Sequence, residues 1–159
     1  MSLFANKIAS AKPSEGGVYL LKGNYLLQID VNKAKLGRRN QELYIAEVDI
    51  LESSNPERPA GSHASWVASS EHESAAGDVK SYLAAVAGVP ADAVDAAGVD
   101  ASTSAENPLG GRLVRCEVVE KPTKKGGIFS KHYFHAVPEE FQAQAAALRQ
   151  QAGLPPRGK

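Results

Sequence analysis

The sequence contains one cysteine, Cys116, so it can form neither an intramolecular disulfide nor a metal site built from several thiolates. No run of 18 apolar residues occurs, and we therefore expect no membrane-spanning helix. The first residues lack a basic stretch followed by an apolar one, so we expect no secretory signal and a cytoplasmic location. The net charge is zero, which argues against a protein that coats nucleic acid through bulk charge.

Motifs for catalysis are also missing: the sequence has no phosphate-binding Walker loop, nucleophile elbow or dinucleotide-binding glycine pattern. His72 lies between two glutamates without the His-x-x-x-His spacing of a metalloprotease helix. His132 and His135 fall on a predicted strand at a spacing of three, so they point to opposite faces and cannot easily share a metal. We expect no enzyme, no cofactor and no metal site.

The neutral total hides a segregation of charge along the chain. Residues 22–39 contain five basic residues and one acid, and residues 112–135 contain six basic residues and two acids. The intervening stretch 71–106 contains seven acids and one lysine. One interpretation is an ordinary solvated surface, because charged residues are usually exposed. The other is a pair of basic binding elements.

Alternating apolar and polar residues predict five strands. In the first, Tyr25, Leu27, Ile29 and Val31 share one face, and Gly23 marks a bulge or bend. The third strand carries the single tryptophan, Trp66. The predicted strands cover residues 18–31, 41–51, 61–69, 111–120 and 127–137.

The remaining elements are predicted helices and loops. Val79, Tyr82, Leu83 and Val86 form one apolar stripe of a helix that ends at Gly88. A short second helix is expected over residues 90–97, and a mobile segment over 98–110. We expect a flexible arm over 1–16, a single domain over 17–137 with a helical insert over 73–97, and a C-terminal helix and tail over 138–159.

The predicted order of elements is three strands, a helical insert, two strands and a terminal helix. A five-stranded OB-type Greek-key barrel has this order. Such barrels bind oligonucleotides on one face and with the loops that join strands 1–2 and 4–5. In this sequence those loops, 32–40 and 122–127, are the basic ones. The fold prediction is therefore a mainly β, OB-type barrel with helical additions.

Single-stranded nucleic acid requires cations for its phosphates and flat rings on which its bases stack. On the last predicted strand, Phe129, Lys131, Tyr133 and His135 share one face, while Ile128 and Phe134 turn toward the core. The alternative is that the rings fill the barrel, where aromatic residues commonly pack. The candidate nucleic-acid-binding residues are Lys33, Lys35, Arg38, Arg39, Tyr44, Trp66, Lys121, Lys124, Lys125, Phe129, Lys131 and Tyr133.

Five segments resemble bacteriophage and prophage proteins with an OB-type barrel that are suspected to bind single-stranded DNA. They are Gly23-Asn24-Tyr25, residues 47–53, Pro59-Ala60-Gly61-Ser62 followed by Ser65-Trp66-Val67, and residues 78–83. The resemblance implies single-stranded DNA as ligand, in phage replication or recombination, with proteins of those pathways as partners. Unlike bacterial single-stranded DNA-binding proteins, the sequence lacks an acidic tip, so recruitment through such a tail is not expected.

The zero net charge, the alanine-rich helices and the acidic middle stretch also fit a second hypothesis. In it the chain is a structural or protein-interaction module, such as a virion component or an accessory factor, that binds no nucleic acid. The sequence leaves the oligomeric state open, a homo-oligomer included.

Overall fold

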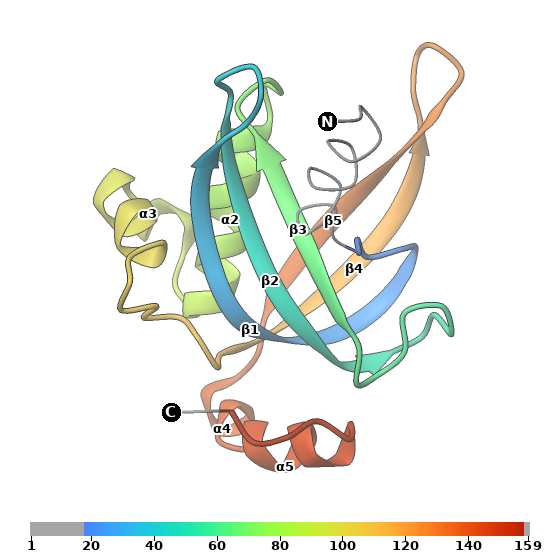
Figure 1. Ribbon diagram of the computed structural model, residues 1–159, viewed down its shortest axis with the longest axis vertical. Coiled ribbons are helices and arrows are strands. Elements are labelled where there is room, and N and C mark those ends of the chain that lie inside the picture. The colour runs from blue at the N-terminus through green and yellow to red at the C-terminus, as the bar shows by residue number, and fades with distance from the viewer. Residues whose placement is uncertain (1–17, 158–159) are drawn as a thin grey trace, which may run out of the picture.

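A computed structural model describes residues 18–157 of the chain. Its main element is a sheet of five antiparallel strands in the spatial order β3-β2-β1-β4-β5 (Figure 1). The predicted mainly β architecture is therefore confirmed. The strands are β1 (Gly23–Leu36), β2 (Glu42–Ser53), β3 (His63–Ser69), β4 (Leu113–Pro122) and β5 (Ile128–Ala136).

Strand β1 is the longest and belongs to both halves of the sheet. It pairs with β2 from Tyr25 to Leu36, and its first six residues, from Gly23 to Gln28, also pair with β4. Its register with β2 shifts between Leu26 and Leu27 and again between Ile29 and Val31. Such bulges bend a strand and increase its twist, and Figure 1 shows β1 curving through the base of the molecule.

The sheet is not closed, because β3 and β5 are its two edges. Across residues 18–157 no strand pairing joins β3 to β5, so the closed Greek-key barrel expected from the sequence is not confirmed. We call the gap between these two strands the seam. A single parallel bridge links Tyr19 to Ser65 at the β3 edge, where the Ser65 N–H donates to the Val18 carbonyl at 2.7 Å. The arm predicted over residues 1–16 lies outside the described residues.

Helix α2 (Ala75–Ala87) follows β3 and packs against β5 and β3. The predicted apolar stripe is confirmed, since all four of its members are buried. The helix ends at Gly88, whose φ of 74° is in the left-handed region that glycine adopts without strain. The buried stripe residues are Val79, Tyr82, Leu83 and Val86.

The prediction for the rest of the insert is wrong in its boundaries. A 3-10 turn, η1 (Ala91–Ala93), replaces the start of the expected second helix, and the helix itself, α3 (Ala96–Ser102), begins later. Asp95 sets that start, because its side chain accepts a hydrogen bond from the Gly98 N–H at 2.9 Å and caps the helix. The segment expected to be mobile therefore contains a helix and then hydrogen-bonded turns.

Four aromatic rings fill the interior between the two halves of the sheet. Trp66 lies 5.0 Å from Tyr82 and 5.1 Å from Phe134 between ring centroids, and Tyr44 lies 6.4 Å from Trp66. Most of these pairs are edge-to-face, the arrangement that aromatic rings favour. The Tyr82 hydroxyl donates to the Asn32 side-chain oxygen at 2.6 Å, and Asn32 is only 1% exposed.

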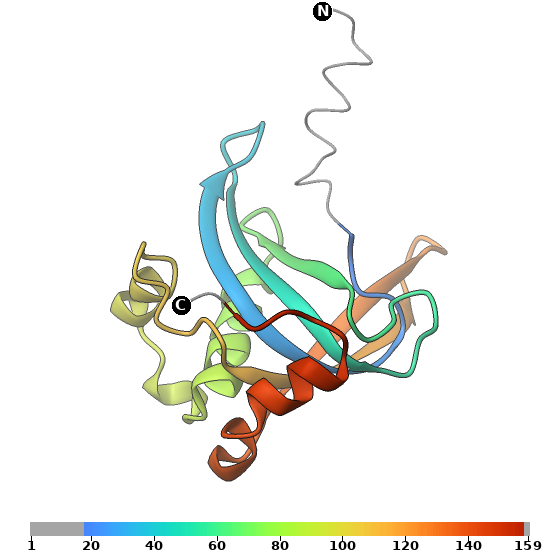
Figure 2. The same ribbon diagram turned by 60° about the horizontal axis from the view of Figure 1, so that its bottom comes forward.

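The C-terminal residues cover the opposite face of the sheet, which we call the outer face (Figure 2). The single helix predicted there is interrupted and forms α4 (Glu139–Gln142) and α5 (Ala145–Gln151). They cover a second, smaller apolar cluster, which contains Leu26, Leu51, Leu113 and Val137. None of the helices within residues 18–157 combines the length and the apolar composition that crossing a membrane requires.

We predict that Tyr82→Phe lowers the free energy of unfolding by about 1–3 kcal/mol. The substitution keeps the ring but leaves the buried Asn32 oxygen without its donor, and an unsatisfied buried acceptor costs about that much. Urea denaturation followed by circular dichroism measures the change. Tyr19→Phe is the control, because its side chain is 48% exposed. Equal stability of the two variants would contradict the prediction.

Candidate nucleic-acid interface

The two basic loops project toward the same end of the molecule, at the top of Figure 1. The strand register alone would not place them together. The β1–β2 loop follows the last residues of β1, whereas the β4–β5 loop lies beyond the first residues of β1, near the Gly23–Val118 pair. The curvature of β1 carries both of its ends upward, and so it brings the two predicted basic elements to one side.

In the β1–β2 hairpin, the predicted cations Arg39 and Lys33 are both paired with carboxylates. Arg39 donates two hydrogen bonds to Glu71, at 2.6 and 2.7 Å, and Lys33 lies 3.5 Å from Glu47. Arg38 is exposed beside Arg39, and no ion pair within residues 18–157 involves it. Arg38 is therefore open to a phosphate, whereas Arg39 must first leave its carboxylate. Lys35 is exposed on the same hairpin.

The β4–β5 hairpin presents lysines and aromatic rings together. Lys121 pairs in register with Phe129, and Lys131 and Tyr133 lie on the same face of β5. The ammonium groups of Lys121 and Lys131 are 5.6 and 5.8 Å from the centroid of the Tyr133 ring, within cation–π range. Phe129 is 45% exposed. This face of β5 therefore offers one ring within cation–π range of two lysines and a second ring open to solvent.

Lys124 and Lys125 are exposed at the tip of this hairpin. The loop is closed by the Gly127 N–H, which donates to the Thr123 hydroxyl at 2.9 Å. The expectation that Ile128 turns into the core is wrong, because this side chain is 69% exposed. The hairpin extends beyond the interior at this point (Figure 1), so no core is available there to cover it.

Tyr44 and Trp66 were expected to join the exposed rings, and the structure corrects this. Each is only 7% exposed, and both pack with Tyr82 in the interior. The Tyr44 hydroxyl shares a buried hydrogen bond of 2.8 Å with Ser102. Burial raises the pKa of Tyr44 to about 12. Neither ring therefore joins the rings on the outer face of β5.

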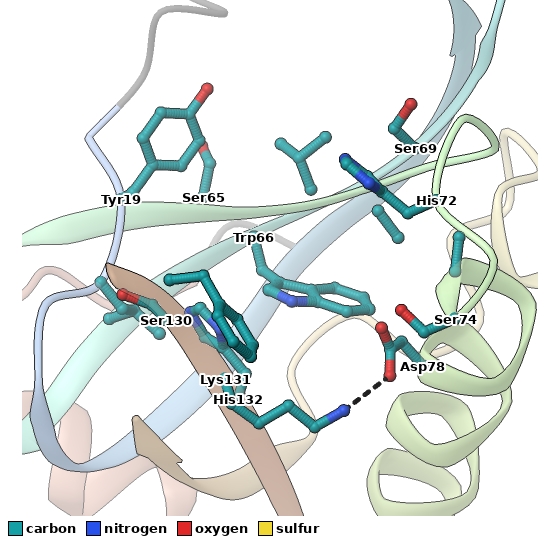
Figure 3. A pocket seen from close by; sticks show the side chains of 15 residues that line it. Tyr19, Ser65, Trp66, Ser69, His72, Ser74, Asp78, Ser130, Lys131 and His132 are labelled. Atoms are coloured by element: carbon teal, nitrogen blue, oxygen red, sulfur yellow. Dashed lines mark hydrogen bonds and ion pairs between the residues drawn. The ribbon is translucent and has the colours of Figure 1, made fainter. Parts of the chain in front are cut away.

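A cleft of about 600 Å³, which no sequence pattern indicated, opens along the seam. Its walls come from β3, from β5 and from the start of α2, three elements that are distant in sequence. Figure 3 shows Trp66 near its centre, with Lys131 reaching past it to Asp78. The Lys131–Asp78 ion pair, at 3.2 Å, joins β5 to α2 across one side of the cleft. Other lining residues are Tyr19, Ser69, His72, Ser74, Phe129 and Ser130.

A second charged cluster, also missed from the sequence, lies on the outer face of β2 and β3. The ring nitrogens of His63 contact Asp49 at 2.9 Å and Glu47 at 3.0 Å. Arg149 of α5 donates to the other oxygen of Asp49 at 2.7 Å. The hydrogen bond with Asp49, and then the one with Glu47, raises the pKa of His63 to about 9, so it is protonated at neutral pH. The cluster ties the C-terminal helix to the sheet.

The pKa values of the two carboxylates shift the other way. Burial acts to raise the pKa of Glu47, but hydrogen bonds from Ser65 and His63 lower it below its ordinary value. Burial likewise opposes the hydrogen bonds from His63 and Arg149 that lower the pKa of Asp49. The acids therefore stabilise the fold above their unfolded-state pKa values, and this contribution is lost as the pH falls.

We predict that the protein loses stability between pH 6.5 and pH 9 because of His63. Its folded-state pKa of about 9 lies above the 6.5 of an unperturbed histidine, so its contribution is complete below pH 6.5 and disappears as the pH rises through 9. Urea midpoints at the two pH values measure the loss. His63→Gln should flatten this dependence, whereas His135→Gln, at an exposed site on β5, should leave it unchanged. An equally steep loss in His63→Gln would refute the assignment.

Comparison with known proteins assigns this chain to no family. The sequence matches no protein-family model, and no curated protein matches it significantly. A functional assignment therefore rests on the loops, the rings and the cleft of this chain.

Proposed function

We propose that this protein binds single-stranded DNA with little sequence preference, across the end of the molecule where the two basic loops project. The observation that carries the proposal is the face of β5, where Lys121 and Lys131 both lie within cation–π range of Tyr133, near the exposed ring of Phe129. Exposed rings stack with unpaired bases of any identity, and exposed lysines such as Lys121 neutralise the adjacent phosphates. A duplex, whose bases are already stacked in pairs, would leave the rings unused.

The proposed path of the strand avoids the acidic cluster. Near the β1–β2 loop, the outer face carries neutral side chains such as Leu43 and Ser69, which are paired in register. Glu47 and Asp49 lie four and six residues further along β2, and His63 and Arg149 compensate their charge. A strand running from the β4–β5 loop to the β1–β2 loop would therefore pass over neutral surface between two groups of cations.

We further propose that the fold is an OB-type barrel opened at one position. An OB-type barrel has a meander of three strands, a helix, and two further strands. Opening such a barrel between its third and fifth strands leaves the order β3-β2-β1-β4-β5, with a helix between β3 and β4. This is the order seen here. The resemblance to phage proteins of this class supports a role in phage replication or recombination, in the cytoplasm of the host cell.

One observation favours a protein-interaction module as the second candidate. A groove of about 750 Å³ lies behind the β1–β2 hairpin, between it and α2 and α3. Its floor includes the apolar side chains of Val79 and Val99, and its rim includes the acids Glu42, Glu73 and Asp100. An acidic rim repels phosphates, so this groove suits a basic protein segment better than DNA.

Fluorescence anisotropy with a labelled oligothymidine of about 12 nucleotides, within the usual site size, tests DNA binding. We expect a saturable rise at low salt, and an unlabelled duplex of the same length should compete weakly. No rise at micromolar protein would rule out the proposal. If the protein binds no DNA, and both the wild type and Arg38→Glu/Arg39→Glu retain the same protein partner, the protein-interaction module remains as the function.

We predict that Lys124→Ala/Lys125→Ala weakens binding and reduces the slope of log affinity against log salt by about 1.4. Each phosphate contact to a single strand contributes about 0.7 to that slope, and the double variant removes two exposed cations. Anisotropy titrations at several salt concentrations give the slope. Lys80→Ala on α2, away from both loops, should leave it unchanged. A loss of affinity at constant slope would show that the two lysines do not contact phosphates.

We predict that Glu71→Gln strengthens binding and steepens the salt dependence by about 0.7, because it releases Arg39 for one more phosphate contact. Glu73→Gln is the matched control: it removes the same charge two residues away and releases no arginine. Adding Arg39→Ala to Glu71→Gln should cancel the gain. An equal gain in the control would mean that only the general charge had changed.

A further inference from the structure

We propose that the seam cleft takes one base of the bound strand, which inserts between β3 and β5 and packs against Trp66 and Phe129. This inference rests on the proposed function and adds a site to it. The half-buried Tyr133 and the exposed Phe129 would stack bases at the surface of β5, whereas the cleft would enclose a single base.

The lining of the cleft matches the chemistry of a nucleobase. A base has two flat apolar faces and a polar edge, and the cleft combines the rings of Trp66 and Phe129 with neutral hydroxyl groups. The hydroxyls of Ser74 and Ser130 come from two different elements around it. A hydroxyl can both donate and accept, so such an edge accommodates any base. Its volume of about 600 Å³ leaves room for one base and its sugar.

The charge of the cleft favours a base over a phosphate. Asp78 lies in the cleft wall, and its carboxylate would repel the backbone of the strand. Lys131, the one lysine among the described residues of the lining, is already paired with Asp78 at 3.2 Å. Inside the cleft the two charges largely compensate each other, which leaves a neutral ligand as the better fit.

The cleft is also in reach of the proposed strand. The ammonium group of Lys131 lies 5.8 Å from the Tyr133 ring on the outer face, and the same group contacts Asp78 in the cleft. Lys131 therefore stands where the outer face of β5 meets the cleft. Phe129 likewise lines the cleft while remaining 45% exposed. A strand on this face would place a nucleotide at the cleft entrance.

Trp66 is the only tryptophan, so its emission reports on the cleft directly. The probes are oligothymidine of about 12 nucleotides and an oligomer of equal length in which every base is absent. Both carry the same phosphates. We expect oligothymidine to change the intensity or wavelength of the Trp66 emission and the abasic oligomer to leave it unchanged at saturation.

Two substitutions fill the cleft from opposite walls: Ser130→Phe from β5 and Ser74→Phe at the start of α2. Both serines are exposed, so the larger ring enters the cleft and not the core. We expect each to weaken oligothymidine binding about tenfold, the loss expected for one stacked base, and to abolish the emission change. Ser130→Ala and Ser74→Ala each remove one hydroxyl but leave the cleft open, so they should keep the emission change and lose much less affinity than the phenylalanine variants.

Photo-crosslinking provides a readout that does not depend on these variants. With 5-iodouracil in place of thymine, we expect mass spectrometry to locate a crosslink on Trp66. Crosslinks confined to Phe129 and Tyr133, or an unchanged Trp66 emission while anisotropy reports binding, would overturn the base site and leave the proposed function intact. If the wild type binds no oligothymidine at low salt, both proposals fall.

Discussion

The bend of β1 is the constraint on which the rest of the structure depends. One strand pairs with β2 along most of its length and with β4 along its first part, so it holds both halves of the sheet. Two register shifts bend it, and the bend turns β3 and β5 toward each other without pairing them. The aromatic rings then fill the space between the halves. The open seam and the buried rings are thus consequences of one curved strand.

The same bend assembles the candidate interface. In a flat sheet, loops at opposite ends of β1 would lie far apart, and a single strand of DNA would reach only one of them. The curvature brings the two loops to one end, with the seam between them (Figure 1). The cations of the first loop, the rings of β5 and the cleft consequently lie along one surface, although they come from separate parts of the chain.

The sequence predicted the strands and the stripe of α2 because both depend on local periodicity, which burial on one face imposes. It did not predict that Tyr44 and Trp66 are buried. The alternation of residues along a strand divides them between two faces of the sheet, but it does not tell which face is buried. The partner of Arg39 was also beyond prediction, since Glu71 is 32 residues away and approaches only through the folded hairpin. The sequence placed the start of the second helix at Pro90, because proline is common in the first turn of a helix. The start of α3 depends instead on the side chain of Asp95, and this single cap is a weaker signal in the sequence than the proline.

Zero net charge is compatible with a nucleic-acid interface here because the acids are distributed unequally over the surface. Glu47 and Asp49 are compensated by His63 and Arg149 on the outer face, and several acids of the insert lie behind the β1–β2 hairpin. The cations at the loop tips remain exposed at one end. A neutral protein of this kind would attract DNA only over a short range, since its distant field cancels, and would release it as salt screens the few local contacts. Affinity would then depend on the rings more than on charge, which makes Tyr133, within cation–π range of two lysines, the residue where both contributions meet.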